Sequence, residues 1–383
     1  YQYYVQSTVD DYGQESPPSE VSEQVTWEPN ERLTVNKAAG LGRLYRSATG
    51  GTESDFFFLA ETADATFIDD LVDAELAEVL PNIENPPSAM SGLVSAPGGF
   101  LAAFAGKDLY MSEPYLPYSW PTEYRLTMDF DIVGLAVSGN DLIVLTTGNP
   151  YYVTGTHPEI VTQSKLPVEQ SCVAKRSIAF AEKYVLYASP DGLVSIAGGN
   201  VQVVTANMYT RDQWQALTPS GMIGSVHDGR YIGFHSGGGI IIDFKEAIAS
   251  LTTTDQTATG VYSDLENDQL YLIQVSNITE WRGGATYLTA TWKSKVFQTV
   301  KTPIWDSGLV IATSYADTIL RLYADGTHVW SYTVTGNSAF RIPKLIRSEN
   351  WQLKIETTDT IHEVILATSM RSLRGGTAEE SLQ

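Results

Sequence analysis

The sequence is poor in residues that mark several large classes of protein. It has a single cysteine, Cys172, among 383 residues, so no disulfide can form within the chain. A lone cysteine is more often a small buried apolar residue than a nucleophile, and no histidine here shows a matching motif. No apolar run approaches the roughly 18 residues that a membrane-spanning helix needs, and no signal peptide is visible.

Positive charge is also scarce. The chain has 24 Lys and Arg against 45 Asp and Glu, which gives a formal net charge of −21. Residues 1–85 hold 17 of the acidic residues and only 4 basic ones, so negative charge is concentrated in the N-terminal part of the chain. Such a surface repels the phosphates of nucleic acids, which argues against tight DNA or RNA binding. It suits the wall of a channel through which DNA passes without being bound.

Motifs for catalysis and cofactor binding are missing too. The five histidines, at 157, 227, 235, 328 and 362, have no metal-binding spacing. The glycine-rich stretches do not fit a phosphate-binding loop, and the Asp-Gly pairs are typical of hairpin turns. We therefore expect no cofactor, no metal and no enzymatic activity. A polysaccharide-degrading enzyme stays open as an alternative, because paired carboxylates come together only in three dimensions.

Strand-forming and turn-forming residues dominate what is present. The chain has 21 Tyr and 31 Gly and is rich in Thr and Val, a mixture that favours strands joined by turns. Residues 1–85 alternate like a small β-sandwich, and the stretch "YQYYVQSTVDDYGQESPP" resembles late strands of a fibronectin type III domain. Because the chain opens on a strand without an initiating Met, we expect it to be a truncated or processed piece. The stretch Asp69–Pro81 is a helix candidate, with a loop as the equal alternative.

An internal repeat follows a proline-containing linker, Asn82–Met90. Five segments share a polar turn, a short apolar strand and then Gly or Asn; their first strand residues are Phe100, Leu142, Tyr184, Tyr231 and Leu270, with spacings of 42, 42, 47 and 39. A period near 40–47 built from strands predicts the four-stranded blades of a β-propeller. A series of small β-sandwich domains is the alternative, although these usually repeat at about 90–100 residues.

These patterns define the predicted domains. We expect an all-β chain with a β-sandwich over residues 1–85, β-propeller blades over 86–301, a further β segment over 302–376 and a solvated tail over 377–383. Whether residues 302–376 close the propeller or form a separate small sandwich is left open by the sequence.

The stretch "LYMSEPYLPYSWPTEYRLT", Leu109 to Thr127, is too irregular for a regular strand or helix. It lies between the first predicted blade and the second, and its prolines fix the backbone at low entropic cost. We predict that it is an inter-blade connector, with its rings wedged between blades and not arranged as a sugar-binding platform. The residues assigned to this structural role are Pro114, Tyr115, Pro117, Tyr118, Trp120 and Pro121.

The same stretch, with "DIVGLAVSGNDLIVLTTGNPYYVTGTHPE", "YASPDGLVSI", "WKSKVF" and "ATSMRSLRGG" in this order, resembles the tail tubular or nozzle proteins of short-tailed bacteriophages. The resemblance extends from about Gly40 to Arg374. It implies a β-propeller with sandwich modules in a virion ring, usually a hexamer, that forms the distal channel for DNA ejection. It also implies docking to a tail adaptor ring, contacts with tail fibres, passage of DNA without sequence-specific binding, and no insertion into a membrane.

A second function remains open beside the resemblance. The aromatic residues of "YLPYSWP", together with Trp281, Trp292 and Trp305, could stack on sugar rings. The chain would then be a glycan-binding β-propeller for adsorption to a host. Core or inter-blade packing is the competing interpretation of the same aromatic residues.

Overall fold

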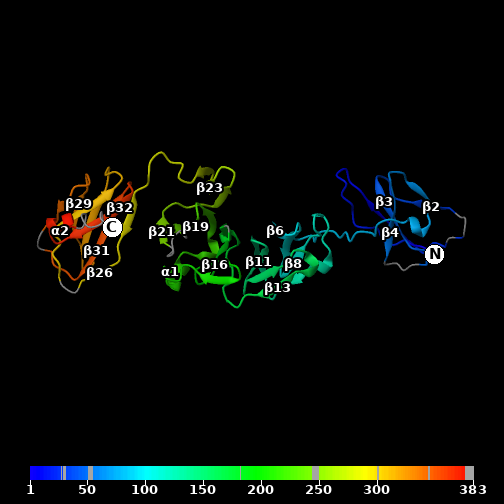
Figure 1. Cartoon of the computed structure of the whole chain (residues 1–383), viewed down its shortest axis with the longest axis horizontal. Coiled ribbons are helices and arrows are strands. Elements are labelled where there is room, and N and C mark those ends of the chain that lie inside the picture. Colours follow the sequence, from blue (N-terminus) through cyan, green and yellow to red (C-terminus); the bar gives the residue numbers. More distant parts are fainter. Residues whose placement is uncertain are drawn as a thin grey trace. The chain divides into compact units, whose positions relative to one another are not determined.

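The computed structural model describes residues 1–26, 28, 32–50, 55–181, 183–243, 250–299, 302–343 and 346–375. Antiparallel sheets make up nearly all of the regular structure in these residues, as the sequence predicts (Figure 1). The chain folds into two compact units, Tyr1–Trp281 and Arg282–Gln383. The predicted tail, residues 377–383, lies outside the described residues.

The first unit begins with two small sheets. One has the strand order β1-β3-β4, and the other pairs β2 with β5: β1 is Tyr4–Thr8, β2 Leu33–Asn36, β3 Gly42–Ser47, β4 Phe56–Thr62 and β5 Thr66–Asp69. Tyr4, Leu44 and Leu59 of the larger sheet share one apolar cluster with Leu33, Val35 and Phe67 of the smaller sheet. The two sheets therefore pack face to face, and the more specific fibronectin III assignment stays a prediction.

A buried ion cluster replaces the helix considered for Asp69–Pro81. Arg46 is fully buried, and its guanidinium donates to both carboxylate oxygens of Asp69 at 2.8 and 2.9 Å and to Asp73 at 3.0 Å. Tyr4 Oη donates to the same Asp69 carboxylate at 2.7 Å. Because these carboxylates are drawn towards Arg46, the segment keeps only one short 3-10 turn, η1 (Asp73–Glu75), and the loop alternative is the observed one.

Five antiparallel sheets, here called sheets 1 to 5, follow the linker. Each is a meander in which neighbours in sequence are neighbours in the sheet. Sheet 1 holds β6 (Ser91–Ser95), β7 (Leu101–Ala105), β8 (Asp108–Met111) and β9 (Leu126–Thr127); sheet 2 holds β10 (Ile132–Ser138), β11 (Asp141–Thr146), β12 (Tyr151–Thr154) and β13 (Thr162–Lys165). Sheet 3 holds β14 (Ala179–Ala181), β15 (Tyr184–Ala188), β16 (Leu193–Ala197) and β17 (Asn200–Val203). Sheet 4 holds β18 (Ile223–His227), β19 (Arg230–His235), β20 (Gly238–Asp243) and β21 (Ser250–Thr254); sheet 5 holds β22 (Gly260–Asp264), β23 (Gln269–Gln274) and β24 (Asn277–Glu280).

Short helices lie between these strands. They are η2 (Thr122–Tyr124), η3 (Pro158–Ile160), η4 (Lys175–Ser177), α1 (Arg211–Ala216) and η5 (Pro219–Gly221). The internal repeat is confirmed, because four of its five marker residues lie in the second strand of successive sheets and Phe100 directly precedes β7.

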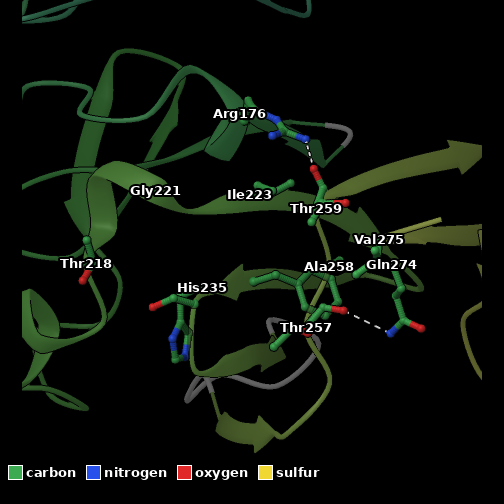
Figure 2. A pocket seen from close by; sticks show the side chains of 12 residues that line it. Arg176, Thr218, Gly221, Ile223, His235, Thr257, Ala258, Thr259, Gln274 and Val275 are labelled. Atoms are coloured by element: carbon green, nitrogen blue, oxygen red, sulfur yellow. Dashed lines mark hydrogen bonds between the residues drawn. The ribbon is translucent and has the colours of Figure 1, made fainter. Parts of the chain in front are cut away.

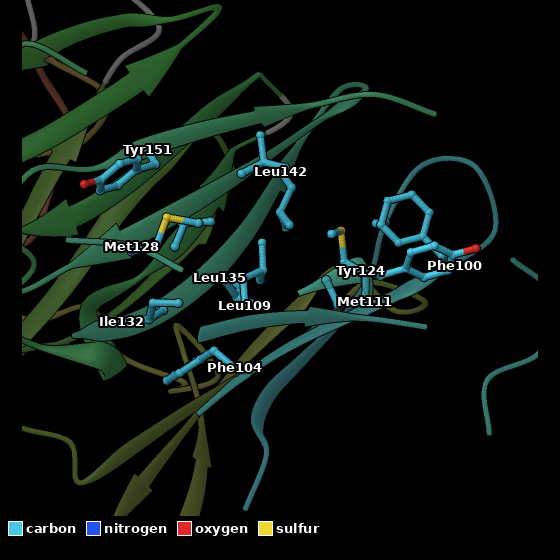
Figure 3. Packing of buried hydrophobic residues seen from close by; sticks show 14 residues of the cluster. Phe100, Phe104, Leu109, Met111, Tyr124, Met128, Ile132, Leu135, Leu142 and Tyr151 are labelled. Carbon is cyan, nitrogen blue, oxygen red and sulfur yellow. The ribbon is translucent and has the colours of Figure 1, made fainter. Parts of the chain in front are cut away.

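Successive sheets pack face to face as the blades of a β-propeller do. Phe104, Leu109 and Met111 of sheet 1 meet Leu135 and Leu142 of sheet 2 in one buried cluster (Figure 3). Similar clusters join sheet 2 to sheet 3, sheet 3 to sheet 4 and sheet 4 to sheet 5. The first strands also lie side by side, β6 next to β10 and β18 next to both β14 and β22. The β-propeller prediction is thus confirmed for residues 91–280, and among the described residues no buried apolar cluster joins sheet 5 to sheet 1.

The second unit is a small sandwich of two sheets. One has the order β25-β31-β28-β29 with β26 also on β31, and the other has the order β30-β27-β32. The strands are β25 (Ala290–Lys293), β26 (Phe297–Gln298), β27 (Ser307–Ala312), β28 (Ile319–Ala324), β29 (Thr327–Thr333), β30 (Phe340–Arg341), β31 (Asn350–Thr357) and β32 (Ile361–Ala367), followed by α2 (Met370–Gly375). One core holds Val310 of the second sheet together with Leu322 and Ile355 of the first. The described residues between 302 and 375 therefore belong to a separate sandwich and do not close the propeller.

The boundary of this sandwich differs from the predicted one at residue 301. The structure places it between Trp281 and Arg282, because β25 and β26 pair with β31, with Trp292 opposite Ile355 and Phe297 opposite Trp351. The predicted blade range 86–301 included these two strands, because the sequence does not show that their partner is β31.

Candidate functional site

The stretch Leu109–Thr127 does not join two blades as predicted: it runs from β8 to β9 within sheet 1, because Leu109 pairs with Leu126, and it forms a folded joint with the linker. The name connector is kept for it below. Trp120 is 4% exposed, its indole Nε1–H donates to the Pro117 carbonyl at 3.0 Å, and its backbone N–H donates to the Glu84 carbonyl at 2.9 Å. Ser119 Oγ donates to the Asn82 carbonyl at 2.8 Å. These hydrogen bonds fix the residues on both sides of the joint. Because the bonded groups have little contact with water, the joint favours a single geometry.

The glutamate of the linker adds a further attachment. The Glu84 carboxylate accepts from the backbone N–H of Thr122 at 3.0 Å and from its hydroxyl at 2.6 Å. Asn82 donates to Glu123 at 2.8 Å. Pro121 is buried and directly precedes η2, a position where its missing N–H and fixed φ cost nothing. The connector is therefore bonded to the linker through Asn82 and through Glu84.

The prediction that Tyr115 is wedged between blades is wrong. Its side chain is 82% exposed, and its backbone lies in the left-handed region at φ 61°. The backbone N–H of Tyr115 donates to the Gly99 carbonyl at 2.8 Å, so the residue caps the turn before β7 in its own sheet. Pro114 and Tyr118 are half-buried and Pro117 is exposed, so only Trp120 and Pro121 of the six predicted residues are buried.

The contact from the connector to sheet 2 is made by Tyr124, which the sequence did not single out. Tyr124 Oη donates to Glu113 at 2.8 Å, and its ring meets the His157 ring edge-on at 6.1 Å between centroids. Burial and the neighbouring Glu113 carboxylate raise the pKa of Tyr124, so the hydroxyl keeps its proton. Near the same place, a Cβ on Gly98 would lie 2.0 Å from the carbonyl oxygen of Thr156, so backbone meets backbone between sheets 1 and 2.

A pocket of about 440 Å³ lies between sheets 4 and 5 (Figure 2). Ile223 and Phe234 supply its apolar wall, and polar side chains from strand ends and connecting segments also line it. These are Arg176 of η4, Thr218, His235, Ser236, Thr257, Thr259 and Gln274. The pocket has an apolar base and a ring of hydrogen-bonding groups, which is the usual character of a binding pocket.

Arg176 supplies the positive charge of this pocket. Its guanidinium donates to the Thr259 carbonyl, and no described carboxylate forms an ion pair with it. Burial lowers the pKa of His235 below its usual 6.5, so the ring is neutral at neutral pH, and Nδ1 accepts from the Gly237 N–H at 3.2 Å. The pocket therefore carries a single cation in a strongly acidic chain.

Exposed apolar side chains are concentrated in one part of the sequence. Of the 23 large apolar residues that are exposed in the described structure, ten lie between residues 262 and 297. In the first unit these are Tyr262, Leu265, Ile273, Val275 and Ile278, all in sheet 5 or its turns; in the second unit they are Tyr287, Leu288, Trp292, Val296 and Phe297. Within each unit, a group of exposed apolar side chains is typical of a surface that is covered in an assembly. Sequence reasoning missed it, although "YLIQVSNITEW" places apolar residues on both faces of a strand.

Residues that could bind a metal or act as nucleophiles do not form a further cluster in the described part of the chain. In the described part of the chain, no three or more His, Cys, Asp or Glu side chains come close enough to hold a metal ion. Cys172 is buried between sheets 2 and 3, and burial raises the pKa of its thiol to about 12. None of the described helices is long and apolar enough to cross a membrane.

Comparisons with known proteins add little to this geometry. No family model matches the chain, and no curated protein matches it. Among solved structures, the extracellular domain of a one component system from B. thetaiotaomicron has a TM-score of 0.37 and 9% identity over 89% of this chain, which spans 46% of that structure. The WD40 β-propeller domain of Doa1 has a TM-score of 0.33 and 10% identity, with 86% and 89% of the two chains covered.

An exo-β-1,3-galactanase from Phanerochaete chrysosporium gives the weakest of these three likenesses. Its TM-score is 0.25 and its identity is 9%, with 72% of this chain and 95% of that chain covered. Likenesses at this level carry no functional information. The chain is an all-β protein with propeller blades, and what it does has to be inferred from its own residues.

Proposed function

We propose that this chain is a structural component of a bacteriophage tail, of the nozzle or tail tubular type. Copies assemble as a ring, with a hexamer as the expected form, around the path that DNA takes during ejection. The ring docks to a tail adaptor protein and contacts tail fibres, and the protein is located in the virion. The role needs no reaction, cofactor or metal.

The observation that carries the proposal is the order of modules in one chain. A series of propeller blades is preceded by one small sheet pair and followed by a β-sandwich, which is the architecture that the sequence resemblance implies. The stretch that contributes most to the resemblance, Leu109–Pro121, lies in a tightly bonded joint around Trp120. Rigid modules suit a part that has to withstand the pressure of packaged DNA.

Charge gives independent support. The 17 acidic residues among residues 1–85 would deny salt bridges to passing DNA wherever they face a channel. We predict that acidic groups of this segment or of the blade loops line a channel or a ring interface. A ring whose lumen is lined by Lys and Arg would refute this part of the proposal.

Size-exclusion chromatography with light scattering and electron microscopy of the full chain test the proposal. The expected result is a large oligomer that appears in micrographs as a symmetric ring, with a matching copy number at the tail of the virion. A chain that stays monomeric at high concentration and is absent from the tail would contradict it.

The pocket between sheets 4 and 5 favours a second candidate, a glycan-binding β-propeller for host adsorption. Gln274 and the hydroxyls of Thr218 and Ser236 offer the hydrogen bonds that a sugar needs beside an apolar wall. A glycan array with the isolated protein tests it. The expected result is binding that Gln274→Ala weakens and that Gln163→Ala, on the exposed strand β13 of sheet 2, leaves unchanged.

A further inference from the structure

The pocket between sheets 4 and 5 contains positive charge and no negative charge. None of the described residues that line it is Asp or Glu, although the chain has 45 of these residues. The cation among them is Arg176 of η4, whose side chain reaches sheet 5, because a Cβ on Gly260 in β22 would lie 3.4 Å from Arg176 Nη2. We call it the Arg176 pocket. Within an acidic chain, it is a place to which a small anion is drawn.

The guanidinium of Arg176 has donors left for a ligand. It donates to the Thr259 carbonyl, and no described carboxylate forms an ion pair with it. A guanidinium carries five N–H donors in a planar fork that matches the two oxygens of a carboxylate. A phosphate ester, with about two negative charges at neutral pH, would meet a single cation in a chain whose net charge is −21. A ligand with one carboxylate therefore fits the pocket better than a phosphate.

The other polar groups are spread around the pocket. Figure 2 shows Arg176 and His235 apart from each other, with Thr218 and Gln274 at further places along the wall. His235 Nδ1 accepts from the Gly237 N–H at 3.2 Å, so the neutral ring carries its proton on Nε2, which is a donor. A lone carboxylate at Arg176 leaves these groups unused, whereas the hydroxyls of a sugar bond to them. The volume of about 440 Å³ also lies in the range of roughly 300–1,000 Å³ that is typical of small-molecule pockets.

Backbone strain is concentrated at the same pocket. In the described part of the chain, two β-branched residues have a positive φ, Thr218 at 57° and Val275 at 55°, and both line the pocket. Thr218 directly precedes η5, and Val275 lies in the turn between β23 and β24. The left-handed region is unfavourable for β-branched side chains, and residues held in it cluster at binding and active sites. Two such residues at one pocket are an independent indication of a ligand site.

We propose that the Arg176 pocket binds a sugar that carries one carboxylate, such as a uronic or sialic acid residue of a glycan. Arg176 binds the carboxylate, and the polar groups around the pocket bind the hydroxyls. The inference rests on the second candidate function, glycan binding, and names the class of glycan. It does not depend on the ring assembly.

Isothermal titration calorimetry of the full chain with D-glucuronate and N-acetylneuraminate, and with uncharged D-glucose, tests the proposal. Both carboxylated sugars should bind at least about tenfold more tightly than glucose, because a charge-assisted bidentate pair is added to the contacts of the sugar. Arg176→Gln should weaken glucuronate binding by at least about tenfold and glucose binding by less than about threefold. The matched control is Arg125→Gln, at an exposed arginine next to η2, which removes the same charge and should change glucuronate binding by less than about twofold.

A second variant guards against a change of structure at Arg176. Arg176→Lys keeps the positive charge and loses the planar fork, so it should bind glucuronate about threefold or more weakly than the wild type and more tightly than Arg176→Gln. Thermal melting of all variants shows whether the blades stay folded. If Arg176→Gln melts at a lower temperature, the comparison of Arg176→Lys with the wild type decides. Wild-type affinity for glucuronate in a folded Arg176→Gln or Arg176→Lys would refute the assignment of Arg176.

The outcomes separate this inference from glycan binding itself. If glucose and glucuronate bind equally, or if only uncharged glycans bind on the array, glycan binding stands and the inference is refuted. If acetate or a short acidic peptide binds as tightly as glucuronate, the pocket is a site for anions alone, which also refutes it. If no glycan binds, charged or uncharged, the inference and the candidate function are both refuted.

Discussion

Replacement of Trp120 tests whether the connector is a joint or an exposed platform. The ring is 4% exposed, and its N–H donates to the Pro117 carbonyl at 3.0 Å. Trp120→Ala removes the whole buried ring and leaves that carbonyl without its partner. Large-to-small substitutions of this kind cost about 3–5 kcal/mol. Trp120→Phe keeps most of the apolar volume and should cost less, since one hydrogen bond contributes roughly 0.5–1.5 kcal/mol.

Tyr115 is the matched control in the same connector. It is 82% exposed, so Tyr115→Ala should change the free energy of unfolding by less than about 0.5 kcal/mol. Chemical denaturation of the full chain, followed by tryptophan fluorescence and circular dichroism, measures both variants. If Trp120→Ala and Tyr115→Ala had the same small effect, the assignment of Trp120 as the structural anchor of the joint would be refuted.

Three further predictions concern other parts of the chain. Gly98→Ala should destabilise the chain by more than Gly106→Ala. Both glycines have positive φ, but only a Cβ on Gly98 would meet a carbonyl, that of Thr156 in sheet 2. Thermal unfolding compares the two variants, and equal effects would contradict the close approach of the two backbones. The Lys354 ammonium and the Arg321 guanidinium lower the pKa of Glu356 below its usual 4.5, so this group stabilises the second unit above that pH and the stabilisation is lost as pH falls through the lowered pKa. Denaturation between pH 7 and pH 3 should show a smaller loss in Glu356→Gln than in the wild type, and identical curves would contradict it. Cys172, whose thiol has its pKa raised to about 12 by burial, should react with Ellman's reagent at pH 8 only after unfolding, so fast labelling of the folded chain would contradict its position between sheets 2 and 3.

The repeated blades could be predicted because their signals are local. A turn residue and an alternating strand recur near Leu142, Tyr184 and Tyr231, and each strand finds its partners in its own hairpin. The same local reasoning failed where the partner is distant. β25 has a clear strand sequence, yet it pairs with β31, about sixty residues further along the chain.

Side-chain chemistry at a distance explains the other differences. Asp69 could have begun a helix, but its carboxylate binds Arg46, 23 residues earlier in the chain. Tyr115 looks like a core aromatic in sequence, but a left-handed turn directs it to solvent. The exposed apolar side chains of sheet 5 could not be predicted either, because "YLIQVSNITEW" shows that both faces of β23 are apolar and not which of them is covered.

A reconstruction by electron microscopy of the assembled protein in the virion tests the central claim most directly. The account predicts a symmetric ring of this chain at the tail, with acidic groups of residues 1–85 or of the blade loops lining its channel or a ring interface. A tail that lacks this chain, or a chain that occurs there as a single isolated copy, would contradict the account.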